Sequence, residues 1–91
     1  MAAVSVLDRA WDTAEVSVRQ EPFGALLYHF GTRRLSFLKD RRLLAVIEHL
    51  GTTATARAAC ASVGVDAAAL PSYERALVRL AATDMFRERT R

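Results

Sequence analysis

The sequence contains few of the residues from which catalytic and metal sites are built. Cys60 is the only cysteine, and His29 and His49 are the only histidines, among 91 residues. A lone cysteine excludes an internal disulfide and is typical of a reducing compartment. The histidines stand in no metal-ligand spacing, no nucleophile has a base near it in the sequence, and no glycine-rich phosphate loop is present. We therefore expect no catalytic residue, no metal and no cofactor, with Cys60 buried and inert.

Long apolar runs and long basic runs are also missing. No stretch approaches the roughly 18 apolar residues of a transmembrane helix, and residues 1–7 lack the basic start of a signal peptide. These absences predict a cytoplasmic protein with no membrane partner. The 13 basic residues are interleaved with 10 acidic ones and leave a formal net charge of +3. Such a balance is typical of a solvated surface, although it also allows an acidic peptide or a nucleic acid as partner.

What the chain has in excess is apolar surface. Hydrophobic residues make up 52% of the sequence, whereas a chain of this length forms a single modest core. The length excludes a barrel or a doubly wound sheet and predicts one domain. Residues 1–12 show no clear period, so we expect a loose N-terminal arm in which Trp11 docks, followed by the folded domain over residues 13–91.

The first half of that domain has the pattern of strands. Val16 and Val18 alternate with polar neighbours, as in a half-buried strand. A second apolar run ends at Gly31, which suits the tight turn of a hairpin. We expect three strands here. The first begins at Glu15, the second spans residues 24–30 and the third spans residues 34–39.

The second half has helical spacing. Asp40 is a suitable N-cap for a first helix that ends at Gly51. A second helix over residues 54–63 would be capped by Thr52 or Thr53 and end at Gly64, and a third would span residues 72–89. Because strands and helices are segregated along the chain, the sequence predicts an α+β, winged-helix-like fold, with a three-stranded antiparallel sheet followed by three helices.

The third expected helix carries apolar residues on two sides. At about 100° per residue, Ala76, Leu77 and Leu80 fall on one stripe, which faces the core. A second stripe lies on the opposite side, next to arginines, and could be buried or could form one wall of a peptide groove. It comprises Val78, Ala82, Met85 and Phe86, flanked by Arg75 and Arg79.

The strand over residues 34–39 is expected at an edge of the sheet. Edge strands present unpaired N–H and C=O groups, to which an incoming peptide strand can bond. The alternative is an ordinary hairpin whose charges discourage aggregation. Pairing of two such edges would also permit a homodimer.

The segment EPFGALLYHFGTRRLSFLK, from Glu21 to Lys39, resembles the signature of the mycofactocin-system peptide chaperones, the MftB family. The similarity continues more loosely through Leu50 and on to Ala58–Cys60. That family is grouped with the peptide chaperone of pyrroloquinoline quinone biosynthesis, PqqD, among the RiPP recognition elements. The resemblance implies three strands, three helices and a non-catalytic carrier without a cofactor. Such a carrier binds the leader of a ribosomally made precursor peptide and presents it to a radical S-adenosylmethionine maturase.

The resemblance also implies a site. In related recognition elements the leader adds as a strand beside the third strand, in a cleft that the third helix completes. In this sequence the strand contributes Arg34, Leu35, Ser36, Phe37, Leu38 and Lys39. From the helix, the stripe arithmetic selects Arg75, Val78, Arg79, Ala82, Met85 and Phe86.

Two other functions remain open at the level of sequence. A winged-helix DNA-binding regulator is compatible with the positive net charge. Its second helix, however, would carry only Arg57, which is poor material for reading bases in a major groove. A small enzyme ranks last, because no catalytic set of residues is visible.

Overall fold

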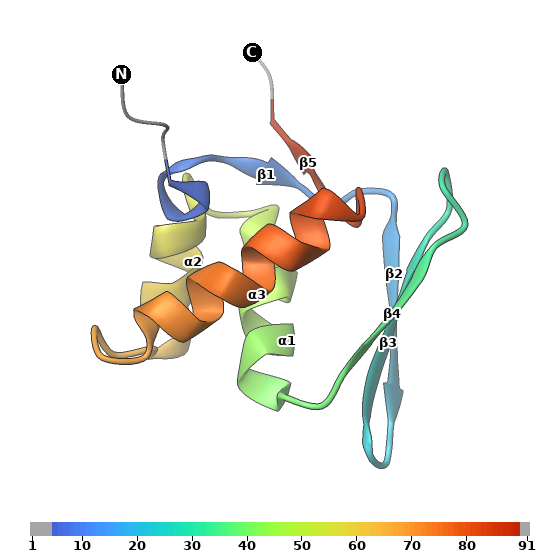
Figure 1. The fold of residues 1–91 in the computed structure, drawn as a ribbon, viewed down its shortest axis with the longest axis horizontal. Helices are drawn as coiled ribbons and strands as arrows, with labels where there is room; N and C mark the ends of the chain where they lie inside the picture. Colours follow the sequence, from blue (N-terminus) through green and yellow to red (C-terminus); the bar gives the residue numbers. More distant parts are fainter. Residues whose placement is uncertain (1–4, 90–91) are drawn as a thin grey trace.

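The computed structural model describes residues 5–89 and confirms the α+β class, with a sheet followed by three helices (Figure 1). The sheet is antiparallel and has the order β2-β3-β4, so β2 and β4 are its edges. Its strands are β2 (Val16–Glu21), β3 (Gly24–His29) and β4 (Leu35–Leu38). The helices are α1 (Arg41–Leu50), α2 (Ala56–Val63) and α3 (Leu70–Ala82).

All three helices lie on one side of the sheet, which Figure 1 shows nearly edge-on. Alternation along β3 follows from this arrangement, because successive strand residues point to opposite faces. Ala25, Leu27 and His29 point to the helices and are buried, whereas Leu26 and Tyr28 lie on the other face and are half-buried. The strands therefore have one face in the core and one face that none of the described elements covers.

His29 is buried for a structural reason. Its ring Nδ1 accepts hydrogen bonds from the backbone N–H groups of Gly31 and Thr32, at 3.1 and 3.0 Å. Its Nε2 lies 3.3 Å from the Glu15 carboxylate. The ring thus satisfies the backbone of the turn between β3 and β4, and it holds the start of β4 in place.

The residues that cap and end α1 and α2 are those predicted from the sequence, with one exception. Asp40 caps α1 as predicted, because its Oδ1 accepts from the amides of Arg42 and Leu43 at 2.8 and 3.2 Å. Gly64, at a φ of 88°, ends α2 as predicted. The cap of α2 is Thr55 rather than Thr52 or Thr53, and the helix begins at Ala56. The earlier threonines instead donate their hydroxyl protons to the carbonyl of His49.

The prediction of a loose N-terminal arm is wrong for residues 5–12, and residues 1–4 lie outside the described part. A short 3₁₀ helix, η1 (Val6–Asp8), and a strand, β1 (Trp11–Asp12), order the segment. Val6 and Leu7 enter the core beside α2 and α3. The sequence does not reveal this, because two apolar residues are too few to show a helical or strand period. Trp11 docks as expected, and its indole N–H donates to the carbonyl of Val6 at 3.0 Å.

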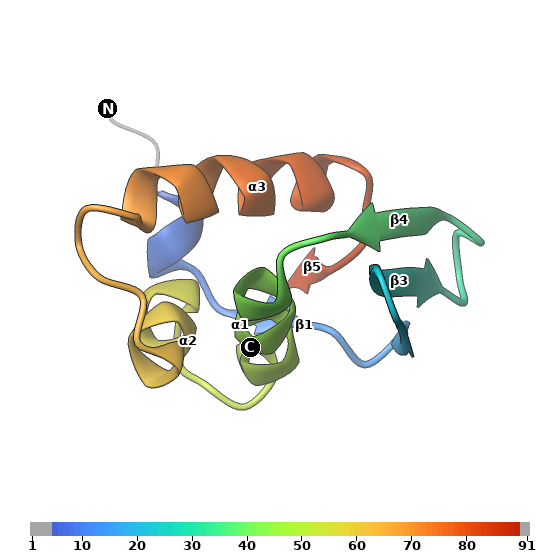
Figure 2. The ribbon, with the colours of Figure 1, turned by 90° about the horizontal axis from the view of Figure 1, so that it is seen from below.

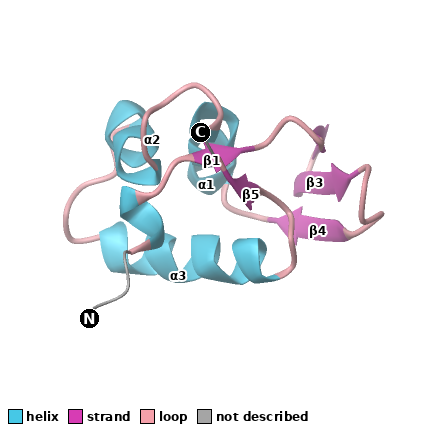
Figure 3. Ribbon diagram, turned by 90° about the horizontal axis from the view of Figure 1, so that it is seen from above, coloured by secondary structure: helices cyan, strands magenta, loops and turns pink. Residues whose placement is uncertain are grey.

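The third helix is shorter than the sequence predicts. It ends at Ala82, and Asp84 takes a left-handed backbone conformation with a φ of 59°. After this turn the chain forms β5 (Arg87–Glu88), which pairs antiparallel with β1 (Figure 3). The apolar spacing continues past Ala82 without a glycine or proline, so the pattern gives no sign of the turn.

Candidate functional site

A cleft of about 300 Å³ lies between β4 and α3, and α1 forms its floor. Figure 2 shows β4 beside the C-terminal end of α3, with α1 below α3 in the view. The volume is at the small end of the range for ligand pockets, and the cleft is open to solvent. Its lining residues are Ser36, Phe37, Leu38, Leu43, Ala76, Arg79, Leu80 and Thr83.

The backbone of β4 has hydrogen-bonding groups at a free edge. The N–H of His29 donates to the carbonyl of Arg34 at 3.0 Å, which sets the phase of the β3–β4 ladder. Because inward and outward groups alternate along an antiparallel strand, Ser36 and Leu38 bond to β3. The N–H and C=O groups of Leu35 and Phe37 then point away from the sheet. A peptide strand placed there would find four unpaired backbone groups.

The surroundings of the cleft are cationic. Arg79 lines it, and Arg34 and Lys39 stand exposed at the two ends of β4. None of the three forms an ion pair with a described residue. The ion pairs found within residues 5–89 are Arg9–Glu88, Arg19–Glu21 and Arg57–Asp8. The cleft therefore offers positive charge to a partner that carries carboxylates.

Four of the residues that the sequence selected for the site line this cleft. Four further lining residues were missed, among them Leu43 of α1 and two that the stripe arithmetic assigned to the core. The sequence does hold a signal for the missed residues at the α3 wall. Together with Arg79 they recur at the spacing i, i+3, i+4, i+7, which is that of one helix face. The selected residues are Ser36, Phe37, Leu38 and Arg79; the missed ones are Leu43, Ala76, Leu80 and Thr83.

Other selected residues on α3 lie outside the cleft. Arg75 and Val78 line a separate hollow of about 530 Å³, which shares only Arg79 with the cleft. Val78 and Ala82 also border a hollow beside Trp11. Val78 remains 50% exposed, so residues 5–12 leave this part of the second stripe open.

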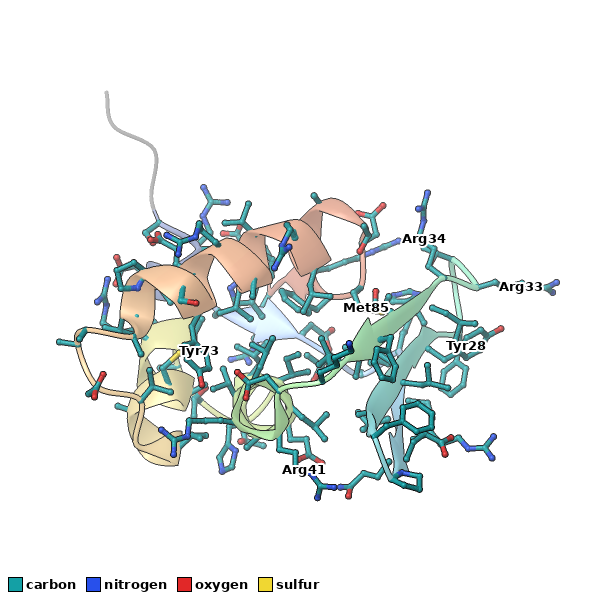
Figure 4. The ribbon with its side chains drawn as sticks, turned by 60° about the horizontal axis from the view of Figure 1, so that its bottom comes forward. Tyr28, Arg33, Arg34, Arg41, Tyr73 and Met85 are labelled. Carbon is teal, nitrogen blue, oxygen red and sulfur yellow. The ribbon has the colours of Figure 1, made fainter. Side chains whose placement is uncertain are left out.

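Met85 and Phe86 are corrections to the predicted site. Their exposed fractions are 0% and 2%, and Figure 4 shows Met85 between the helices and the sheet. They are buried because the helix ends before them and the turn at Asp84 directs the following chain inward. Neither side chain can line a groove for a peptide.

The strand residues divide between the two faces of the sheet. Leu38 is buried, whereas Leu35 and Phe37 are 65% and 41% exposed and point away from the helices. Arg34 and Lys39 are exposed beyond the two ends of the cleft lining. The strand thus offers its backbone edge to the cleft and two apolar side chains to the opposite face.

Two groups outside the cleft are buried or already engaged, the thiol of Cys60 and the guanidinium of Arg57. Burial raises the pKa of the Cys60 thiol, whose side chain is fully enclosed. Arg57, the arginine of α2, makes two hydrogen bonds to Asp8, at 2.9 and 3.2 Å, and these lower the pKa of the Asp8 carboxyl. Within residues 5–89, no group of three histidine, cysteine or acidic side chains is placed to hold a metal ion. No helix in that range has the length and apolar character needed to cross a membrane.

Comparison with known proteins points to one family. The model of the peptide chaperone MftB family matches residues 10–87. The chain is 53% identical over 79 residues to the peptide chaperone MftB of Mycobacterium ulcerans, and 52% identical over 79 residues to that of Mycobacterium tuberculosis. Each alignment covers 86% of this chain and 72% of the relative.

A third relative, the peptide chaperone MftB of Mycolicibacterium smegmatis, is 57% identical over 51 residues, which are 56% of this chain and 50% of that protein. No solved structure matches the chain. The family model spans β1 to the start of β5 and so includes both walls of the cleft. The chain belongs to the peptide chaperone MftB family.

Proposed function

We propose that this peptide chaperone is a non-catalytic carrier for the leader of the mycofactocin precursor peptide. The leader binds as a strand added to β4, and the carrier presents the bound peptide to a radical S-adenosylmethionine maturase. The observation that carries the proposal is the free backbone edge of β4 beside a cleft whose other wall is α3. Strand addition to an exposed edge is a recurring mode of peptide recognition.

Backbone groups would supply the affinity of this complex. The N–H and C=O groups of Leu35 and Phe37 are the free partners for the leader backbone. Because these groups exist at the edge for any peptide sequence, they select an extended conformation rather than particular side chains.

Side-chain groups in the cleft would supply specificity. Leu43, Ala76 and Leu80 form an apolar lining, and Arg79 adds a positive charge. A leader with apolar residues at alternate positions and a carboxylate near Arg79 satisfies both. This chain then binds and orients the peptide, and the maturase carries out the bond-making steps.

Calorimetric titration with two peptides tests the proposal. The purified protein is titrated first with the full precursor and then with a precursor that lacks its leader. Saturable heat with the first peptide and none with the second is the expected result. Equal binding of both peptides, or of neither, rejects leader recognition.

A charge reversal locates the binding. Arg79→Glu replaces a favourable contact with a repulsive one and should weaken the leader complex about tenfold or more. Arg19→Glu changes the net charge equally on the far strand β2 and is the matched control. If the control weakens binding as much as Arg79→Glu does, the effect is one of net charge and the cleft is not the site.

A further inference from the structure

The face of the sheet that points away from the helices carries an apolar patch. Exposed fractions are 68% for Phe23, 60% for Phe30 and 65% for Leu35, and Phe37 is 41% exposed. We call this patch the outer face; it comprises Phe23, Leu26, Tyr28, Phe30, Leu35 and Phe37.

The outer face is continuous rather than a scatter of single residues. The register places Leu26 opposite Phe37 and Tyr28 opposite Leu35, so these side chains are cross-strand neighbours. The rings of Phe23 and Phe37 have centroids 5.4 Å apart, and those of Tyr28 and Phe30 are 5.7 Å apart. Contiguous exposed apolar patches mark interaction sites, and aromatic residues are enriched at the centres of protein interfaces.

The charges around the patch indicate the kind of partner. Arg33 and Arg34 stand at the turn beside Phe30, point away from the body of the molecule in Figure 4, and form no ion pair with a described residue. The acidic residue on this face, Glu21, is already paired with Arg19 at 2.9 Å. A second copy of the chain would therefore bring the same arginines and no free carboxylate. The complementary surface is an apolar one bordered by acidic residues, on a different protein.

The position of the patch relates it to the leader site. A strand added beside β4 continues the sheet, and its alternate side chains project onto the outer face. A protein docked on that face would contact the chaperone and the leader together. Leu35 and Phe37 would then serve both partners, with their backbone groups bonded to the peptide and their side chains in contact with the protein.

We propose that the outer face is the docking surface for the peptide-modifying enzyme. This inference rests on the proposed function, because it takes the enzyme to be the maturase that receives the bound leader. It also implies that the leader strengthens binding of the enzyme, since the peptide adds contact area to the same surface. By linkage, the enzyme strengthens binding of the leader by the same factor.

The test uses residues of the outer face that lie outside the leader site. Phe23→Ser and Phe30→Ser are combined in one variant, and Val78→Ser, which replaces an exposed side chain on α3, is the control. Affinities for the purified radical S-adenosylmethionine enzyme and for the leader peptide are measured separately by calorimetry. The double variant should lose about tenfold or more in affinity for the enzyme, with leader affinity unchanged, and the control should keep both.

A second variant addresses the charged border without removing apolar surface. Arg33→Glu should slow association with the enzyme, with the largest difference from the unaltered protein at low salt. Its leader affinity should be unchanged, because Arg33 lies outside the cleft. Sedimentation of the free protein shows whether a second copy occupies the face instead.

The outcomes separate this inference from the proposed function. Unchanged enzyme affinity in the double variant overturns the docking surface, as does an unchanged association rate in Arg33→Glu or a dimer that the double variant converts to monomer. Loss of leader binding in the double variant would show that the outer face binds the leader, and this result also overturns the docking surface for the enzyme. Absence of leader binding in the unaltered protein, by contrast, rejects the proposed function.

Discussion

Trp11 and Phe86 pack edge to face, with ring centroids 5.1 Å apart and ring planes at 74°. They come from opposite ends of the chain and meet where β1 pairs with β5. Arg89 reinforces the same junction, because its guanidinium donates to the carbonyls of Trp11 and Leu50 at 2.7 and 3.0 Å. The junction closes the core over the helices and explains why Phe86 belongs to folding rather than to peptide binding.

Truncation of Phe86 should therefore destabilise the protein. Phe86→Ala removes a ring that is 2% exposed and should lower the free energy of unfolding by about 3–5 kcal/mol. Val78→Ala, at a half-exposed site, should change it by less than about 0.5 kcal/mol. Urea unfolding followed by circular dichroism measures both. If the Phe86→Ala protein keeps its stability but binds the leader more weakly, Phe86 lines the peptide groove and this account of its role is wrong.

Gly24 should resist substitution for two reasons. Its φ is 155°, and a Cβ built on it would collide with the backbone carbonyl of Leu38. Gly24→Ala should therefore cost more stability than Gly64→Ala, by a further about 1–3 kcal/mol. Gly64 also has a positive φ, 88°, but a Cβ there meets nothing within 4 Å. Thermal unfolding of the two variants compares them, and equal melting temperatures would show that β3 and β4 do not approach as closely as described.

The free edge of β4 can be tested with a proline. Leu35→Pro removes an N–H that points away from the sheet, so the ladder with β3 should survive. Leader affinity should fall by about tenfold, because a backbone donor to the peptide is lost. Leu35→Ala is the control, since it also loses the side chain but keeps the N–H. Calorimetry of both variants with the leader peptide provides the comparison; equal affinities would argue against strand addition at this edge.

The Cys60 thiol should be unreactive in the folded protein. Its side chain is enclosed, and burial raises the pKa above its ordinary value of 9.0. The folded state therefore favours the neutral thiol, and this contribution to stability is present below pH 9.0 and is lost as the pH rises above the folded pKa. Reaction with a chromogenic disulfide at pH 7 should be slow in buffer and fast in denaturant. Equal rates in the two solutions would place Cys60 at the surface.

Local signals predicted most of the framework from sequence. Asp40 caps α1 through contacts within its own first turn, and Gly64 ends α2 through its own backbone conformation. Alternation at Val16 and Val18 marks β2 because the sheet has one buried face. Each of these features depends on residues that are neighbours in the sequence, so a pattern can reveal them.

The errors arose where distant segments decide the structure. Val6 and Leu7 are ordered by α2 and α3, which no local period shows. Met85 and Phe86 continue an apolar spacing that suits a helix, yet they become buried because the chain turns at Asp84 and pairs with β1. Of the residues selected from the sequence, the cleft lining includes Ser36, Phe37 and Leu38 on the strand but only Arg79 on α3, because the face of a helix that borders a cleft depends on how the helix packs.

Amide hydrogen exchange of the free protein and of its complex with the precursor peptide is the most direct measurement of strand addition to β4. The amides of Leu35 and Phe37 face the free edge of β4, and those of Val18 and Gln20 face the free edge of β2. Peptide binding should slow exchange at Leu35 and Phe37 and leave Val18 and Gln20 unchanged. Protection at the edge of β2, or at neither edge, would contradict leader binding as a strand beside β4.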